Sequence, residues 1–105
     1  MINARFRKNN GLYTGFTVSG HAGGYSDSGV DLICASVSSA AYMAVNTITE
    51  VILCDIDCEE RDGYMRVDVT GNGEKAKTAS VMIAGLRLHL HELAKTYPEF
   101  IILEE

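Results

Sequence analysis

Polar and apolar residues alternate along the first part of the chain, and this pattern predicts two strands. The first predicted strand covers residues 2–8 and the second covers residues 12–18. The side chains expected on the inward faces are those of Ile2, Ala4, Phe6, Leu12, Thr14, Phe16 and Val18. Asn9-Asn10-Gly11 separates the strands, and it favours a hairpin turn because Asn and Gly tolerate positive φ. The second strand therefore delivers His21 just beyond its end.

The apolar period becomes helical after a glycine-rich stretch. A helix is expected from about Asp31 to about Glu50. Its predicted inward face carries Cys34, Val37, Ala41, Val45 and Ile48. Two N-caps compete: Asp31 would place Cys34 in the first turn, whereas Ser28, with Asp31 closing a capping box, would place it one turn deeper. The many Ala and Ser residues indicate a central, mostly buried helix.

The second half of the chain repeats this order and adds one strand. Period two returns over residues 51–59, a turn follows at residues 61–63, and residues 64–70 form the return strand. The side chains assigned to the first of these strands are Ile52, Cys54, Ile56 and Cys58 on one face and Leu53, Asp55, Asp57 and Glu59 on the other. The return strand is expected to point Met65, Val67 and Val69 inward.

A second helix should begin after an Asn72 cap and end at Pro98, and residues 100–103 form a last strand. Its predicted inward residues are Ala79, Met82, Ile83, Leu86, Leu90, Leu93 and Tyr97. The order strand-strand-helix-strand-strand-helix-strand predicts an α+β two-layer sandwich, with one mainly antiparallel sheet and two helices. We expect residues 1–105 to form a single domain.

Composition narrows the class of protein. The chain has 105 residues and a net charge of −5, which argues against a nucleic-acid surface and would suit a basic partner. The first residues are too few and too polar for a signal peptide, and no apolar run approaches the length of a membrane span. Three cysteines without scaffold spacing predict reduced thiols in a cytoplasm.

His21 and Cys34 are the main candidates for chemistry. A thiol at a helix start with a histidine nearby is a candidate nucleophile with its base, because both neighbours favour the thiolate. The alternatives are a small buried hydrophobe for Cys34 and a loop histidine bonded to backbone for His21. Asp31 is a helix cap, an orienter of His21, or both. Ser38, one turn from Cys34, either lies at the site or bonds back to its own helix.

Metal and phosphate binding are weaker possibilities. The spacing of Cys54 and Cys58 is not the usual short metal clip, and His89 and His91 would point to different sides of a helix. The glycine pairs lack the context of a phosphate loop. We expect no metal and no cofactor.

Several motifs together resemble the Prp family of ribosomal-processing cysteine proteases. The matching segments are Gly20-His21-Ala22, Gly29-x-Asp31-Leu32-Ile33-Cys34-Ala35-x-Val37-Ser38, Asn46, Gly71-Asn72-x-Glu74-Lys75 and Tyr97-Pro98-x-Phe100-Ile101. The resemblance covers nearly the whole chain.

The resemblance implies a cytoplasmic, homodimeric α+β endopeptidase. It implies removal of a short N-terminal extension from large-subunit ribosomal protein twenty-seven, with no direct contact to nucleic acid or membrane. By the match, Cys34 is the nucleophile and His21 the catalytic histidine, while Asp31 and Ser38 lie at the site. Gly20 and Ala22 flank the histidine, and the family's mobile substrate loop corresponds to residues 22–29, with Gly23, Gly24 and Gly29.

Three departures from the family pattern are present. Leu32-Ile33 replaces the expected Ile-Val, and Ser36 replaces an alanine. Gly23-Gly24 makes the loop between histidine and cysteine one residue longer than the pattern, which would alter loop closure or the accepted cleavage sequence. Two other functions fit the residues: a non-catalytic module that binds a ribosomal protein or assembly factor, and a structural homodimer module with a buried Cys34.

Overall fold

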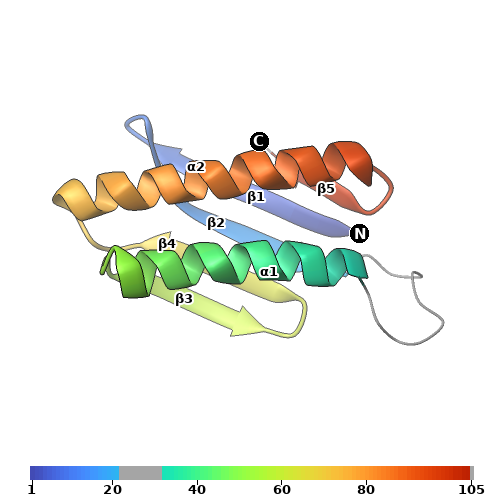
Figure 1. The fold of residues 1–105 in the computed structure, drawn as a ribbon, viewed down its shortest axis with the longest axis horizontal. Coiled ribbons are helices and arrows are strands. Elements are labelled where there is room, and N and C mark those ends of the chain that lie inside the picture. Colours follow the sequence, from blue (N-terminus) through green and yellow to red (C-terminus); the bar gives the residue numbers. More distant parts are fainter. Residues whose placement is uncertain (22–31, 105) are drawn as a thin grey trace.

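Two helices lie side by side on one face of a five-stranded sheet (Figure 1). The computed structural model describes residues 1–21 and 32–104. The elements are β1 (Ile2–Asn9), β2 (Leu12–Gly20), α1 (Leu32–Asn46), η1 (Thr47–Val51), β3 (Ile56–Arg61), β4 (Tyr64–Val69), α2 (Gly73–Thr96) and β5 (Ile101–Glu104). The strand order is β3-β4-β2-β1-β5. The predicted two-layer α+β sandwich is therefore confirmed.

The sheet is mixed, because its last pair is parallel. β1 pairs with β2, β2 with β4 and β3 with β4 in antiparallel fashion, whereas β5 runs parallel to β1. The parallel pair is possible because α2 carries the chain back along the sheet before β5 begins. The description "mainly antiparallel" holds for three of the four pairs.

A bulge in the first hairpin overturns part of the predicted inward face of β2. Arg7 pairs with Gly15 and Lys8 with Tyr13, so Thr14 has no partner of its own. For the residues of β2 before the bulge, the faces are exchanged. Tyr13 packs against the core in place of Leu12 and Thr14. Phe16 is fully buried as expected.

The first helix follows its predicted bounds, but the expectation that it is mostly buried is wrong, because eight of the fifteen residues of α1 are exposed and only one side of it faces the core. The buried residues are Ile33, Val37, Ala41, Ala44 and, in the π-helical turn η1, Ile48. Cys34 and Val45, predicted on the same face, lie at its edge and are half-buried. Both candidate caps, Ser28 and Asp31, lie outside the described residues.

The expectation that no apolar run approaches the length of a membrane span is wrong for the segment Leu32–Val51. It is 20 residues long with a mean hydropathy of 1.3, so by length and composition it is apolar enough to cross a membrane. The chain thus does contain an apolar run of that length. In the fold, one side of this segment packs into the core of the sandwich, and a core helix meets the same test.

β3 is shorter than predicted, which separates the two cysteines that we placed on one strand face. Residues 47–51 continue the helix, Leu53 adopts a positive φ of 61°, and the strand begins only at Ile56. Cys54 is buried before the strand. Cys58 pairs with the buried Val67 but is exposed, because β3 is an edge strand.

α2 confirms the predicted apolar face. Ala79, Ile83, Leu86 and Leu90 are buried, and Met82, Leu93 and Tyr97 pack against the core. Asn72 occupies the N-cap position, but its side chain makes no capping hydrogen bond. The predicted cap is thus right in position and wrong in mechanism.

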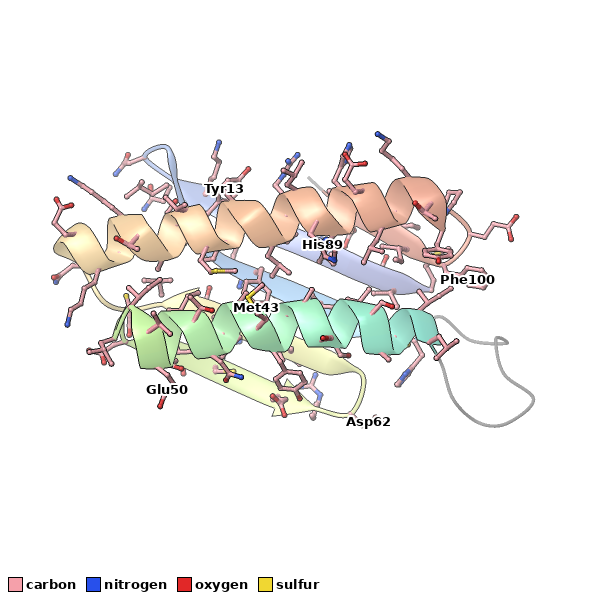
Figure 2. All side chains as sticks on the ribbon, in the orientation of Figure 1. Tyr13, Met43, Glu50, Asp62, His89 and Phe100 are labelled. Carbon is pink, nitrogen blue, oxygen red and sulfur yellow. The ribbon has the colours of Figure 1, made fainter. Side chains whose placement is uncertain are left out.

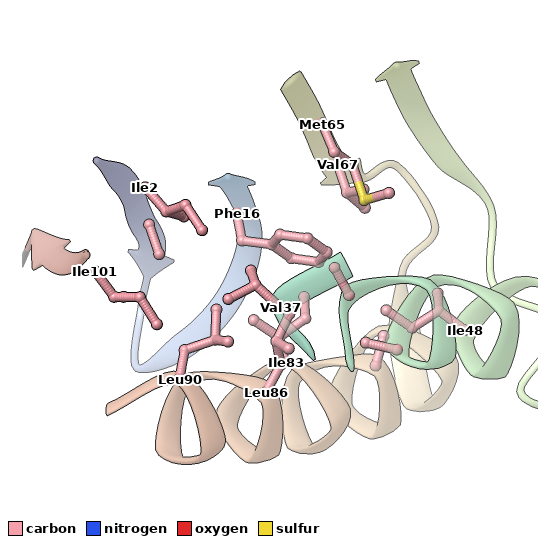
Figure 3. Close-up of a cluster of buried hydrophobic side chains, with 14 of the residues drawn as sticks. Ile2, Phe16, Val37, Ile48, Met65, Val67, Ile83, Leu86, Leu90 and Ile101 are labelled. Atoms are coloured by element: carbon pink, nitrogen blue, oxygen red, sulfur yellow. The ribbon is translucent and has the colours of Figure 1, made fainter. Parts of the chain in front are cut away.

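The core lies between the helices and the sheet (Figure 3). Its labelled side chains are Ile2, Phe16, Val37, Ile48, Met65, Val67, Ile83, Leu86, Leu90 and Ile101. Both helices and four of the strands contribute to the core. The core therefore fixes the position of the last residues of β2 relative to the first residues of α1. His21 and Cys34 lie at those two ends.

Candidate active site

Backbone contacts position His21 at the end of β2. Gly20 has a φ of +94°, and a Cβ atom there would lie 2.2 Å from the carbonyl oxygen of Met1. The amino group of Met1 donates a hydrogen bond to the carbonyl oxygen of His21. The Gly20 N–H donates to the Gly63 carbonyl oxygen at 2.8 Å. The end of β2 is therefore fastened on both sides, immediately before the imidazole.

Cys34 comes from the first described turn of α1. Ile33 and Val37 are buried and face the core, so Cys34 lies at the flank of this buried stripe. Its Sγ atom is 4.0 Å from Nδ1 of His21. The thiol is half-buried, whereas the side chain of His21 is 59% exposed. The predicted pair is thus brought together from two elements.

The other side of the imidazole faces the turn between β3 and β4. Nε2 of His21 lies 3.9 Å from Oδ2 of Asp62. A Cβ atom on Gly63 would lie only 2.6 Å from the same Nε2 atom. The ring therefore lies between the thiol and this turn, and Figure 2 shows Asp62 at the turn.

A cleft of about 480 Å³ opens beside the thiol and the imidazole. Its lining residues are Ile2, Val18, Gly20, His21, Cys34, Ala35, Val37, Ser38, Ala41, Tyr42, Glu60, Arg61, Asp62, Gly63, Tyr64 and Met65. The floor is largely apolar and comes from the sheet and α1, and the charged residues come from the β3–β4 hairpin. A concave site of this size, with a few polar groups on an apolar floor, is typical of a binding site next to reactive side chains.

Charged and polar groups interact along one wall of the cleft. A hydrogen bond with Glu60 raises the pKa of the Tyr42 hydroxyl, and burial raises it further by a smaller amount. Burial raises the pKa of the nearby Cys58 thiol, and the negative charge of Glu60 adds to this effect. On the same hairpin, the Arg61 guanidinium lies 3.8 Å from the centre of the Tyr64 ring.

The remaining predicted site residues divide into two groups. Ser38 lines the cleft one turn after Cys34, and Gly20 makes the close backbone contact beside His21. Asp31, Ala22, Gly23, Gly24 and Gly29 lie outside the described residues, so their predicted roles stay predictions.

The residues considered for metal binding are dispersed. Cys54 is buried near Asp55, and Cys58 is exposed on β3. His89 lines a groove between α1 and α2 (Figure 2). Within residues 1–21 and 32–104, no group of three or more His, Cys, Asp and Glu side chains is arranged to hold a metal ion.

The sequence pattern predicts Asp62 and Gly63 only as part of a turn and gives no sign that they reach the site. Ser19 pairs with Tyr64, so the β3–β4 turn lies next to the end of β2. The signal for this proximity is the pairing of two strands distant in sequence. It could have been found only if the strand order had been known.

A thiol on the first described turn of a helix, an imidazole 4.0 Å away and an adjoining cleft are the parts of a cysteine-dependent hydrolase. The family model described as cysteine protease Prp matches residues 1–102, and the chain belongs to this family. It is therefore a cysteine peptidase by family.

Solved structures share this fold. The Streptococcus mutans protein SMU.848 is 29% identical, with a TM-score of 0.80 over 99% of this chain and 92% of that one. The essential ribosomal processing protease Prp of Staphylococcus aureus, with a covalently linked product peptide, is 24% identical, with a TM-score of 0.85 over 99% and 98% of the two chains. The same protease with a substrate peptide is 20% identical, with a TM-score of 0.81 over the same shares. Comparison with curated proteins finds no match.

Proposed function

We propose that this chain is a ribosomal-processing endopeptidase in which Cys34 is the nucleophile and His21 the acid and base. The observation that carries the proposal is the 4.0 Å approach of Sγ to Nδ1, two atoms of residues that line the cleft. Family membership supports the reaction, and the peptide complexes of the Staphylococcus aureus protease support a peptide substrate. The substrate would be the N-terminal extension of a ribosomal protein precursor, which the motif resemblance names as protein twenty-seven.

In the first half of the reaction, His21 holds the proton of the Cys34 thiol. The thiolate sulfur attacks the scissile carbonyl carbon, and a C–S bond forms as the carbonyl π electrons move to oxygen. Backbone N–H groups at the start of α1 would stabilise this oxyanion, because the first N–H groups of a helix have no partner within the helix. The C–N bond then breaks as His21 gives its proton to the leaving amine, and a thioester remains.

In the second half, water releases the acyl group. His21, now neutral, takes a proton from water while the water oxygen attacks the thioester carbon. The C–S bond breaks, the cleaved extension leaves as a carboxylic acid, and the proton returns to the Cys34–His21 pair. Sγ and Nδ1 are farther apart than in a direct N–H···O hydrogen bond, and such contacts commonly tighten when substrate binds.

The direct test is precursor cleavage by purified variants, followed by mass spectrometry of both products. Cys34→Ala and His21→Ala should each reduce kcat/KM at least about a thousandfold. Cys58→Ala is the matched control, because it removes an exposed thiol that is not itself among the residues lining the cleft, and it should leave cleavage unchanged. Cleavage by Cys34→Ala at the unmodified rate would refute the proposal.

Alkylation provides a second test that needs no substrate. Cys34 should react with iodoacetamide faster than the buried Cys54, and replacement of His21 by Ala should slow it. Homodimerisation and a cytoplasmic location are also part of the proposal, since the resemblance implies both. Sedimentation of the purified chain would test the first, and fractionation of cells would test the second.

A further inference from the structure

We propose that the β3–β4 turn, through Asp62 and Gly63, is the positioning element for the His21 imidazole. This inference rests on the proposed role of His21 as the partner of Cys34. The turn consists of two residues between the paired residues Arg61 and Tyr64. The turn lies next to the end of β2 in space, but it is some forty residues from His21 in the sequence. No local sequence motif therefore reveals that the turn and His21 are neighbours.

The turn is held firmly against the end of β2. Its Gly63 carbonyl accepts the 2.8 Å hydrogen bond from the Gly20 N–H, one residue before the histidine. Ser19 pairs with Tyr64 in the sheet, and Arg61 lies over the Tyr64 ring. The position of the turn relative to the His21 backbone is therefore set by the sheet and not by the turn alone.

Gly63 places its backbone directly against the ring. The hypothetical Cβ would lie 2.6 Å from Nε2, 3.2 Å from Cδ2 and 3.3 Å from Cε1 of His21. Three ring atoms thus lie where a side chain would have to be. Any residue with a Cβ must push the imidazole away from its present position, and this would change its distance to Cys34.

Asp62 supplies a charge on the side of the ring opposite the thiol. Nδ1 faces Sγ at 4.0 Å, and Nε2 faces Oδ2 of Asp62 at 3.9 Å. When His21 holds the thiol proton it is an imidazolium, and the carboxylate attracts it. The Asp62 side chain is 99% exposed, so this attraction is modest and must weaken as salt screens it.

The first experiment compares Asp62→Asn with Glu74→Gln, which removes one charge from an exposed carboxylate at the start of α2. Alkylation of Cys34 by iodoacetamide is measured from about 0.01 M to about 1 M salt, as the Debye length falls from about 30 Å to about 3 Å. Asp62→Asn should slow alkylation roughly two- to fivefold at low salt, and the difference from the unmodified protein should vanish at high salt. Glu74→Gln should match the unmodified protein throughout.

The second experiment compares Gly63→Ala with Gly73→Ala. The two glycines have φ values of +69° and +68°, but nothing lies within 4 Å of a Cβ at Gly73. Both variants should lose similar stability, because the backbone strain is the same. Only Gly63→Ala should reduce kcat for precursor cleavage, on the order of a hundredfold, because only it displaces the imidazole.

The outcomes separate this inference from the proposed function. If His21→Ala slows Cys34 alkylation while Asp62→Asn and Gly63→Ala leave both alkylation and kcat unchanged, the inference fails and the proposed function stands. If His21→Ala has no effect on alkylation or cleavage, the proposed function fails as well. A higher KM with unchanged kcat in Asp62→Asn would show that Asp62 contacts the peptide, and would overturn its positioning role.

Discussion

Replacement of Gly20 by Ala tests the backbone contact that delivers His21 to the site. Gly20 has a φ of +94°, and the added Cβ would lie 2.2 Å from the backbone carbonyl oxygen of Met1. That atom belongs to the main chain, so the strain cannot be relieved by rotating a side chain. Either the first residue of the chain or the end of β2 has to move.

The magnitude has two parts. A residue with a Cβ at positive φ costs about 1–2 kcal/mol. Movement of the strand end would also break the hydrogen bond from the Gly20 N–H to Gly63 and that from the Met1 amino group to His21. Each hydrogen bond contributes about 0.5–1.5 kcal/mol, so the total loss in the free energy of unfolding should be about 2–5 kcal/mol.

Gly11→Ala is the matched control for this substitution. Gly11 also has a positive φ, +80°, but nothing lies within 4 Å of its hypothetical Cβ. It should therefore lose only the backbone part, about 1–2 kcal/mol. Urea unfolding of both variants measures the difference, and precursor cleavage should fall further in Gly20→Ala than in Gly11→Ala. Equal losses in both assays would refute the argument from close approach.

Three further predictions follow from the electrostatics, the core and the helix start. Glu60→Gln should lower the raised pKa of Cys58, since a nearby negative charge disfavours the thiolate; its alkylation at pH 8 should then become faster, as read by mass spectrometry. Phe16→Ala should destabilise the fold by about 3–5 kcal/mol in urea unfolding, because Phe16 is fully buried between the two layers, and a smaller loss would mean that the core collapses around the gap. Asn72→Ala should cost well under the ~1 kcal/mol typical of an N-cap, because its side chain makes no capping hydrogen bond; a full loss in the same assay would contradict the observed geometry.

The elements themselves were determined largely by local patterns in the sequence. Alternation predicts β1 and β4, and the period of Ala79, Ile83, Leu86 and Leu90 predicts α2, because each element must bury one face. The sequence makes His21 and Cys34 candidates for one site, but nearness in sequence does not establish nearness in space, and the 4.0 Å distance between Sγ and Nδ1 comes from the tertiary structure.

What the sequence alone did not show depends on contacts between distant residues. The bulge at Thr14 depends on the pairing of β1 with β2, and the late start of β3 depends on the helix continuing to Val51. Period-two spacing over residues 51–59 looked like a strand, but tertiary packing extended the helix and placed Cys54 in the core. Periodicity shows which positions are apolar, but over a short stretch it does not determine whether the backbone there is helical or extended.

The contribution of the β3–β4 turn to the site was decided only by the tertiary structure. Asp62 and Gly63 read as an ordinary hairpin turn in the sequence. They reach His21 because β4 pairs with β2, so that Gly63 accepts a hydrogen bond beside the histidine. Local propensity determines where a turn forms, whereas strand order determines which side chain the turn meets, and strand order is set by the burial of the whole core.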